Sequence, residues 1–218
     1  MGSVKSVNRG QVQEVEWRGT TYRTGIYKRP VQGPIRVEGV ALVGDEQADL
    51  AVHGGKDKSV YAYPVEHYDF WKQELPSEQR GHLEVWGAFG ENLTIEGLTE
   101  HDVGIGDVLQ IGTTRLRVTE PRMPCATLGL RFRDPMMTKR FYKAERNGFY
   151  LTIDQAGELK AGDEITIVER HPQRLSIAQV ISLRTETLTD PEILALALTH
   201  PGLPESLRER LSKGASAD

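Results

Sequence analysis

Short β-favouring runs separated by glycine-containing turns occupy the first two thirds of the chain. Many short strands of this kind are typical of a closed or nearly closed barrel. No stretch approaches the length of about 18 apolar residues that marks a membrane-spanning helix. We therefore predict a mixed α/β fold built on a mostly antiparallel β-barrel with accessory helices. The predicted strands are residues 4–8, 11–17, 20–23, 35–37, 59–63, 91–95, 108–111, 114–119, 149–153 and 165–168.

Two segments with helical periodicity interrupt the β pattern. Residues 64–75 begin with Pro64, which suits the first turn of a helix, and apolar residues follow at helical spacing. Asp134 and Pro135 read as an N-cap followed by a proline at the first helical position, which predicts a helix over residues 136–144. Both helices are expected as insertions in the barrel domain.

The sequence changes character near Pro172, where three short helical segments follow one another. A capping box at Ser176 opens the first, Thr189 opens the second with the same pattern, and Pro204 starts the third. Helices this short are not stable alone in water, so they must pack on each other or on the barrel. We predict a barrel domain over residues 1–171 and a three-helix module, packed on the barrel, over residues 172–218.

Charge and cysteine content narrow the classes of function. The 27 Lys and Arg residues against 31 Asp and Glu give a net charge of −4, so no nucleic-acid polymer is expected as partner. The single cysteine, Cys125, excludes an internal disulfide framework and a Cys-rich zinc site, and indicates a reducing setting. The first residues carry no apolar signal segment. We expect a cytoplasmic protein without a membrane partner.

Two adjacent glycines, Gly54 and Gly55, lie between His53 and Lys58 in the segment that leads into the strand at 59–63. Paired glycines let the backbone approach a ligand closely, and basic side chains around exposed N–H groups form an anion site. The spacing is not that of a P-loop, and a strand follows instead of a helix. The alternative is an ordinary β-turn with solvated lysines.

Cys125 is presented on a short segment stiffened by two prolines, Pro121 and Pro124. Arg122 lies in the same segment, and a nearby cation favours the thiolate over the thiol. This arrangement favours a functional cysteine. The alternative is a buried structural thiol, which is how an unmodified cysteine is most often found.

Two further segments carry weaker signals. Asn92, in the glycine-rich run at residues 87–94, offers both donors and acceptors, and Lys28 follows a glycine in residues 24–28. The alternatives are a glycine-rich entry to a strand, with Asn92 capping a turn, and a solvated lysine.

These segments occur together and in order, and the set resembles the MOSC domain family. The strings that carry the resemblance are V-H-G-G-x-D-K-x-V-Y-x-Y at residues 52–63, F-G-E-N-L-T at 89–94 and P-R-x-P-C at 121–125. The likeness is greater to the YiiM-like branch, which adds a three-helix C-terminal module, and it extends from about residue 4 to residue 213.

The resemblance implies a β-barrel around a positively charged cavity that accepts molybdenum cofactor, the molybdopterin-bound form of the metal. Cys125 falls on the position of the family's cysteine, which implies that it is the thiolate ligand to molybdenum. Residues implied as cofactor contacts are Arg122, Lys28, His53 and Lys58 for phosphate or pterin, Gly54 and Gly55 for close backbone approach, and Asn92 as a polar pterin contact.

The resemblance also implies an activity, which is reduction of small N-hydroxylated compounds such as 6-hydroxylaminopurine to amines, a detoxification of mutagenic base analogues. A separate electron-donating reductase is then expected as partner, because the chain has no cysteine set for iron–sulfur clusters and no G-x-G-x-x-G fingerprint. A homodimer is left open. The alternative function is a carrier that binds molybdenum cofactor, or sulfur on Cys125, and has no turnover of its own.

Overall fold

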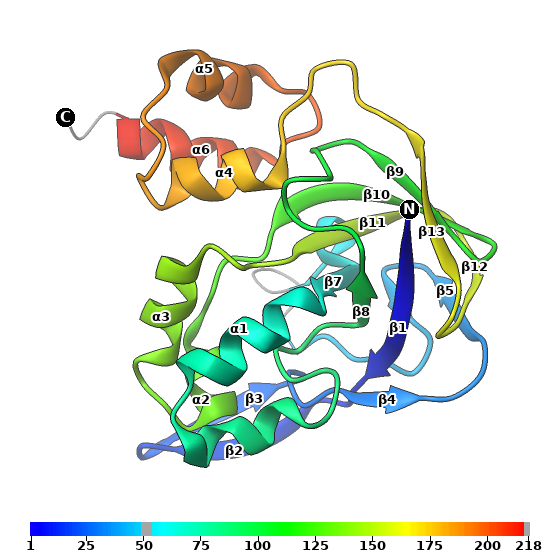
Figure 1. The fold of residues 1–218 in the computed structure, drawn as a ribbon, viewed down its shortest axis with the longest axis vertical. Coiled ribbons are helices and arrows are strands. Elements are labelled where there is room, and N and C mark those ends of the chain that lie inside the picture. The colour runs from blue at the N-terminus through cyan, green and yellow to red at the C-terminus, as the bar shows by residue number, and fades with distance from the viewer. Residues whose placement is uncertain (49–53, 216–218) are drawn as a thin grey trace.

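The computed structural model describes residues 1–48 and 54–215, and a closed barrel of seven strands forms its centre (Figure 1). The strands follow one another around the barrel in the order β13-β9-β10-β11-β7-β8-β1, and β1 pairs again with β13 to close it. The pair β7–β8 is parallel and the other pairs in the barrel are antiparallel. The barrel strands are β1 (Gly2–Arg9), β7 (Val60–Pro64), β8 (Leu93–Glu96), β9 (Val108–Ile111), β10 (Thr114–Pro121), β11 (Phe149–Gln155) and β13 (Glu164–Glu169).

The predicted mostly antiparallel barrel is therefore confirmed, and each predicted run overlaps an observed strand. Three short strands were not predicted from the sequence. They are β4 (Arg29–Val31), β6 (Ala41–Leu42) and β12 (Gly157–Leu159). Strand β4 pairs with β1, whereas β6 and β12 flank β5 (Ile35–Glu38) in a small second sheet. A separate hairpin joins β2 (Gln13–Trp17) to β3 (Thr20–Thr24).

Three helices cover one side of the barrel, as Figure 1 shows: α1 (Glu66–Glu74), α2 (Ala126–Phe132) and α3 (Met137–Ala144). The placement of Pro64 in the first turn of α1 was wrong. Pro64 ends β7 opposite Ile95, and the N–H of Val65 donates to the carbonyl of Ile95 (2.7 Å), so strand pairing continues through the proline. The helix α2 was not predicted. Two 3-10 helices are also present: η1 (Lys56–Lys58) is a single turn, and η2 (Ser77–Leu83) is longer.

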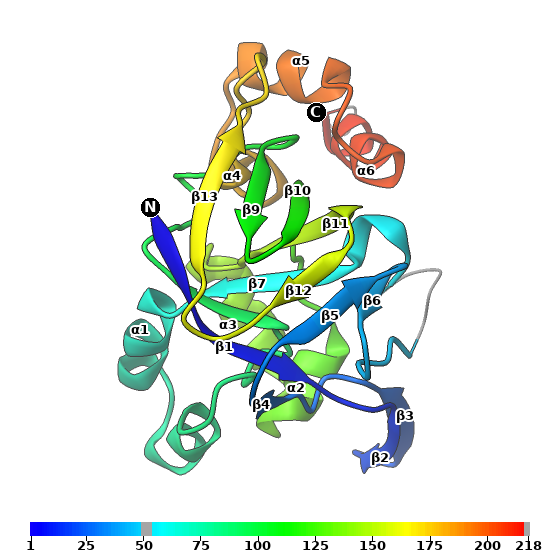
Figure 2. The ribbon, with the colours of Figure 1, turned by 90° about the vertical axis from the view of Figure 1, so that its right-hand side faces the viewer.

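The tail forms three helices at one end of the barrel (Figures 1 and 2): α4 (Ile177–Arg184), α5 (Pro191–Thr199) and α6 (Glu205–Ala215). The capping box at Ser176 is present, with the hydroxyl accepting from the N–H of Gln179. Helix α5 is capped by Asp190 in place of Thr189, because the Asp190 carboxylate accepts from the N–H groups of Glu192 and Ile193. None of the described helices is long and apolar enough to cross a membrane.

Two apolar cores stabilise the molecule. The aliphatic core fills the barrel and continues without a break into the tail. Its tail members are Leu175, Ile177, Val180, Ile181, Ala197, Leu203, Leu207 and Leu211. The aromatic core lies between β7 and the helices α1, α2 and α3. Its ring-bearing members are Tyr61, Tyr63, Tyr68, Trp71, Phe89, Phe132 and Phe141.

Candidate functional site

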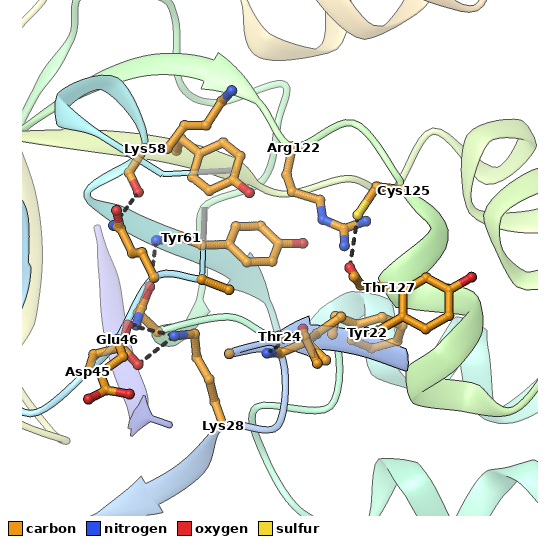
Figure 3. Close-up of a pocket in the computed structure, with 18 of the residues that line it drawn as sticks. Tyr22, Thr24, Lys28, Asp45, Glu46, Lys58, Tyr61, Arg122, Cys125 and Thr127 are labelled. Atoms are coloured by element: carbon orange, nitrogen blue, oxygen red, sulfur yellow. Dashed lines mark hydrogen bonds and ion pairs between the residues drawn. The ribbon is translucent and has the colours of Figure 1, made fainter. Parts of the chain in front are cut away.

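A cavity of about 360 Å³ opens between the β2–β3 hairpin, the barrel strands and the segment that follows β10 (Figure 3). Residues from distant parts of the sequence meet there because barrel closure brings the ends of β7, β8 and β10 together. The described residues that line it are Tyr22, Arg23, Thr24, Gly25, Ile26, Lys28, Asp45, Glu46, Gln47, Ala48, Lys58, Tyr61, Phe89, Gly90, Asn92, Arg122, Met123, Cys125, Ala126, Thr127 and Tyr150.

Arg122 is a buried cation at the end of β10, and its side chain lies beside Cys125 in Figure 3. The guanidinium carbon lies 5.2 Å from the ring centre of Phe141 and 5.8 Å from that of Tyr61. Burial alone would lower the pKa of Arg122, but the neighbouring Cys125 thiol and Tyr61 phenol raise it above its ordinary value. Its Nη1 is buried and makes no hydrogen bond to any described residue. A donor left in this state can donate a hydrogen bond to an anionic group in the cavity.

Cys125 is half-buried and forms the N-cap of α2, with an extended backbone at φ −135°. Its Sγ lies 2.9 Å from Oγ1 of Thr127, and its carbonyl accepts from the hydroxyl of Thr138 (3.2 Å). The helix that starts directly after Cys125 holds the sulfur at the cavity wall. The stiff segment expected from the two prolines therefore runs into a helix.

Lys28 lies on the opposite side of the cavity from Arg122 in Figure 3, and its charge is compensated. Its Nζ is 2.5 Å from both carboxylate oxygens of Asp45. Burial lowers the pKa of Lys28, and Asp45 opposes that shift. Asp45 also accepts from Nδ2 of Asn92 (2.8 Å) and from the N–H of Gly10 (2.8 Å). Sequence reasoning missed Asp45, so it overstated the positive charge that Lys28 brings to the cavity.

Of the other predicted cofactor contacts, some line the cavity and some do not. Lys58 lines the cavity and lies 3.6 Å from Oε1 of Glu120. Gly54 and Gly55 are not among the described lining residues, although the N–H of Gly55 donates to Gln47, which is one of them. His53 lies outside the described residues. Of the predicted site residues, the structure thus brings together Cys125, Arg122, Lys28, Lys58 and Asn92.

Flat aromatic side chains form much of the remaining wall, and none of them was predicted as a site residue. Tyr22 comes from the hairpin, Tyr61 from β7, Phe89 from the loop before β8, and Tyr150 from β11. The rings of Tyr61 and Tyr150 lie 5.3 Å apart. Burial raises the pKa of Tyr150 to about 12 against the opposing effect of Arg122, so its phenol stays protonated at neutral pH. The Y-x-Y string marked Tyr61, whereas no local signal marks Tyr22 or Tyr150.

The family model for the MOSC domain matches residues 49–166, which is more than half of the chain. The chain belongs to the MOSC domain family. MOSC domains are associated with binding of molybdenum cofactor in general. The match includes the cysteine segment and the Asn92 segment, and it stops before the tail helices.

Relatives extend the match beyond the MOSC domain itself. The uncharacterized protein YflK of Bacillus subtilis is 34% identical over 97% of this chain and 93% of its own length. Protein YiiM of Escherichia coli is 35% identical over 67% of this chain and 65% of its own. The crystal structure of YiiM from Geobacillus stearothermophilus superposes with a TM-score of 0.78 at 30% identity and covers 98% of both chains. The tail helices are therefore part of the shared architecture.

Proposed function

We propose that this MOSC domain protein is a molybdenum-cofactor-dependent reductase that converts small N-hydroxylated compounds, such as 6-hydroxylaminopurine, to amines. One observation carries the proposal. Arg122 is buried with Nη1 lacking a hydrogen bond to any described residue, and it lies beside the only cysteine of the chain in a cavity. A relative from Gibberella moniliformis named "Reductase", 34% identical over 74% of this chain, supports it, although the match covers 28% of that longer protein.

The lining residues fit molybdenum cofactor, which carries a phosphate, a flat pterin and a soft metal. The orphaned Nη1 of Arg122 suits an anionic group. The thiol of Cys125 suits a soft metal already bound through sulfur. The rings of Tyr61, Phe89 and Tyr150 suit a flat heterocycle. When bound, the cofactor supplies two-electron redox chemistry.

The residues of the chain would bind, orient and exclude water in this reaction. Cys125 would hold the metal, and Arg122 would keep the sulfur anionic and neutralise charge beside it. The aromatic wall would hold a flat base substrate and exclude water. The overall reaction takes R–NH–OH, two electrons and two protons to R–NH₂ and water, so a separate reductase is expected to return the electrons.

The decisive experiment uses protein produced in a cofactor-competent host, with a chemical reductant and 6-hydroxylaminopurine as substrate. We expect wild type to release the amine and Cys125→Ser to fall to background, because a serine hydroxyl is a harder and far more basic ligand than a thiolate. The Ser variant should keep the wild-type melting temperature, since the two side chains are close in size.

The control is Thr138→Val, which removes the hydroxyl that donates to the Cys125 carbonyl without changing the cavity wall. It should retain turnover and so separate sulfur chemistry from disturbance of the segment. Full turnover by a folded Cys125→Ser variant would refute the proposal. Stable cofactor loading without turnover, followed by transfer to an apo-enzyme, would show the carrier function instead.

A further inference from the structure

The guanidinium of Arg122 contacts the phenol of Tyr150 and the rings of Tyr61 and Phe141, and none of these groups carries a formal negative charge. No carboxylate among the described residues forms an ion pair with it, and its ring contacts at 5.2 Å and 5.8 Å set no fixed direction. Pro121 precedes it and Pro124 follows two residues later, which limits the backbone but does not anchor it. The position of this charge beside Cys125 therefore also depends on what holds the Arg122 peptide groups.

Both peptide groups of Arg122 are held by the same neighbouring segment, Arg146–Gly148, which leads into β11. The side-chain Nδ2 of Asn147 donates to the carbonyl of Arg122 (2.8 Å). The N–H of Arg122 donates to the carbonyl of Gly148 (3.3 Å). Asn147 is fully buried, so its amide has no water as an alternative partner. We propose that Asn147 is a positioning residue that fixes Arg122 beside Cys125.

The Arg146–Gly148 segment is itself anchored by one buried polar group at each residue. The hydroxyl of Tyr63 donates to the carbonyl of Arg146 (3.1 Å), and that of Tyr61 to the carbonyl of Asn147 (2.7 Å). The N–H of Gly148 donates to Oε1 of Glu100 (2.6 Å). Directional bonds at three successive residues leave the segment little freedom. Asn147 is thus a rigid support for Arg122.

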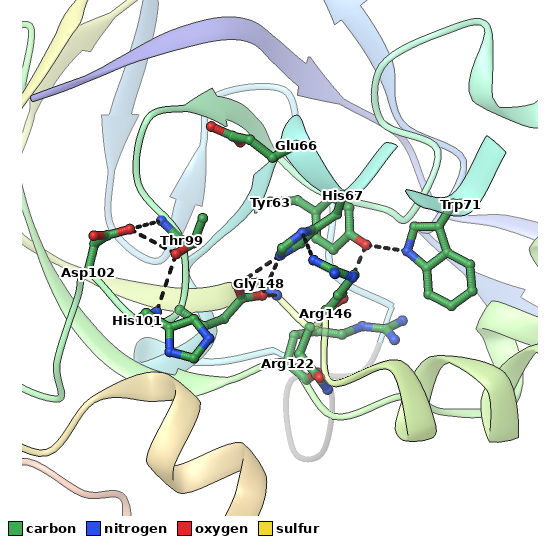
Figure 4. A network of polar contacts seen from close by, with 12 residues as sticks. Tyr63, Glu66, His67, Trp71, Thr99, His101, Asp102, Arg122, Arg146 and Gly148 are labelled. Carbon is green, nitrogen blue, oxygen red and sulfur yellow. Dashed lines mark hydrogen bonds and ion pairs between the residues drawn. The ribbon is translucent and has the colours of Figure 1, made fainter. Parts of the chain in front are cut away.

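Glu100 is kept in place by His67, whose Nε2 lies 2.8 Å from one carboxylate oxygen and 3.0 Å from the other. The Nδ1 of the same ring lies 3.3 Å from Nη1 of Arg146 (Figure 4). Because a guanidinium nitrogen only donates, Nδ1 must accept, and the ring hydrogen belongs on Nε2, where it points at Glu100. The network therefore runs without a donor conflict from His67 to Arg122.

Glycine is required at position 148. Its φ is +65°, and a Cβ there would come 2.4 Å from the carbonyl oxygen of Ala62. The segment is thus pressed against β7, and Asn147 is the residue whose side chain reaches across to the Arg122 segment. This inference deepens the proposed function, because it explains how the charge beside Cys125 is held.

The test measures the rate at which iodoacetamide alkylates Cys125 in the full, cofactor-free chain at pH 7. Arg122→Gln removes the charge and should slow alkylation roughly three- to ten-fold, because less of the thiol is ionised. Asn147→Ala should slow it by a similar factor, since the guanidinium leaves the sulfur. If Asn147→Ala does not fold, Asn147→Ser leaves a smaller void and should show the same direction of change.

Thr114→Val is the matched control, because Thr114 is also fully buried, and its hydroxyl donates to the carbonyl of Ile111 (2.9 Å) at the other end of β10. It should lower the melting temperature as Asn147→Ala does and leave the alkylation rate unchanged. Slow alkylation of Arg122→Gln with a wild-type rate in both Asn147 variants would overturn the positioning role and leave the proposed function intact. Wild-type rates in all of these variants would also overturn the positioning role, because Arg122 would then not act on Cys125, whereas the proposed function is decided by the turnover of Cys125→Ser.

Discussion

The two apolar cores differ in chemistry as well as in place. The aliphatic core has no polar side-chain atom, and Phe149 is its single aromatic member. In the aromatic core, Tyr61, Tyr63, Tyr68 and Trp71 each carry a donor that is used: Trp71 donates to Tyr63, and Tyr68 to Glu91. The cavity lies against the aromatic core, with Tyr61 and Phe89 belonging to both.

The two cores therefore have different roles: the aliphatic core stabilises the fold, and the aromatic core orients the groups that surround Cys125. Apolar contacts are not directional, so the aliphatic core can hold the barrel and tail together but cannot orient a peptide group. Buried hydroxyl and indole groups must find partners of defined geometry. Substitutions in the aliphatic core should therefore change the free energy of unfolding, and those in the aromatic core should also change the chemistry of Cys125.

The largest expected effect comes from removing the tail's share of the aliphatic core. A chain that stops after His171 loses the buried residues of α4, α5 and α6 and exposes the barrel residues they cover. Full burial of each Leu or Ile is worth about 1.5–3 kcal/mol, and a typical domain is stable by only about 5–15 kcal/mol. We expect aggregation, or loss of a cooperative transition, in soluble-yield and thermal-unfolding measurements.

A chain that stops after Lys213 is the control for this truncation. It keeps Leu207 and Leu211, the buried residues of α6, and should unfold at the wild-type temperature. If the shorter chain, ending at His171, also unfolds at the wild-type temperature, the tail is not part of the cooperative fold, and the barrel closes its core without it.

Sequence reasoning found the barrel strands because alternation and glycine turns are local signals. It missed α2 because that helix is short, contains Gly129 and begins at a cysteine, which is not a usual cap. It missed Asp45 because nothing near a Gly-Asp turn reveals that Lys28 and Asn92 will meet there after folding. The residues with local motifs could be predicted, whereas the partners that tune their charge depend on long-range closure of the barrel.

Two single substitutions, one in each core, test the same difference with a smaller expected loss of stability than the truncation. Leu109→Ala leaves a void in the aliphatic core and should cost about 2–5 kcal/mol of unfolding free energy, with alkylation of Cys125 unchanged. Tyr63→Phe keeps the ring but removes the hydroxyl that Trp71 and Arg146 use, which should cost only about 1–3 kcal/mol. Yet Tyr63→Phe should slow alkylation, because it loosens the Arg146–Gly148 segment.

Denaturant unfolding and iodoacetamide kinetics on both variants give the two readouts. The opposite ranking, with Leu109→Ala slowing alkylation and Tyr63→Phe leaving it unchanged, would show that the site responds to global stability. The aromatic core would then have no separate role in placing Arg122.

The smallest expected effect is a pH dependence of the network that ends at Glu100. Burial alone would raise the pKa of Glu100, but hydrogen bonds from His67 and from the N–H of Gly148 outweigh it and lower the pKa below the ordinary 4.5. A carboxyl group whose pKa is lowered by folding stabilises the folded state. This stabilisation is complete at a pH above the pKa of the unfolded state and is lost as the pH falls through the pKa of the folded state.

The variant Glu100→Gln tests this stabilisation, because it keeps an oxygen for Gly148 but removes the charge. We therefore expect wild type to exceed Glu100→Gln in unfolding free energy at pH 4.5 and above, and the gap to close in more acidic solution. The gap between wild type and Leu109→Ala should stay constant over the same range, since no titrating group is involved. A gap for Glu100→Gln that is also constant down to acid pH would mean that the charge on Glu100 does not stabilise the segment that supports Arg122.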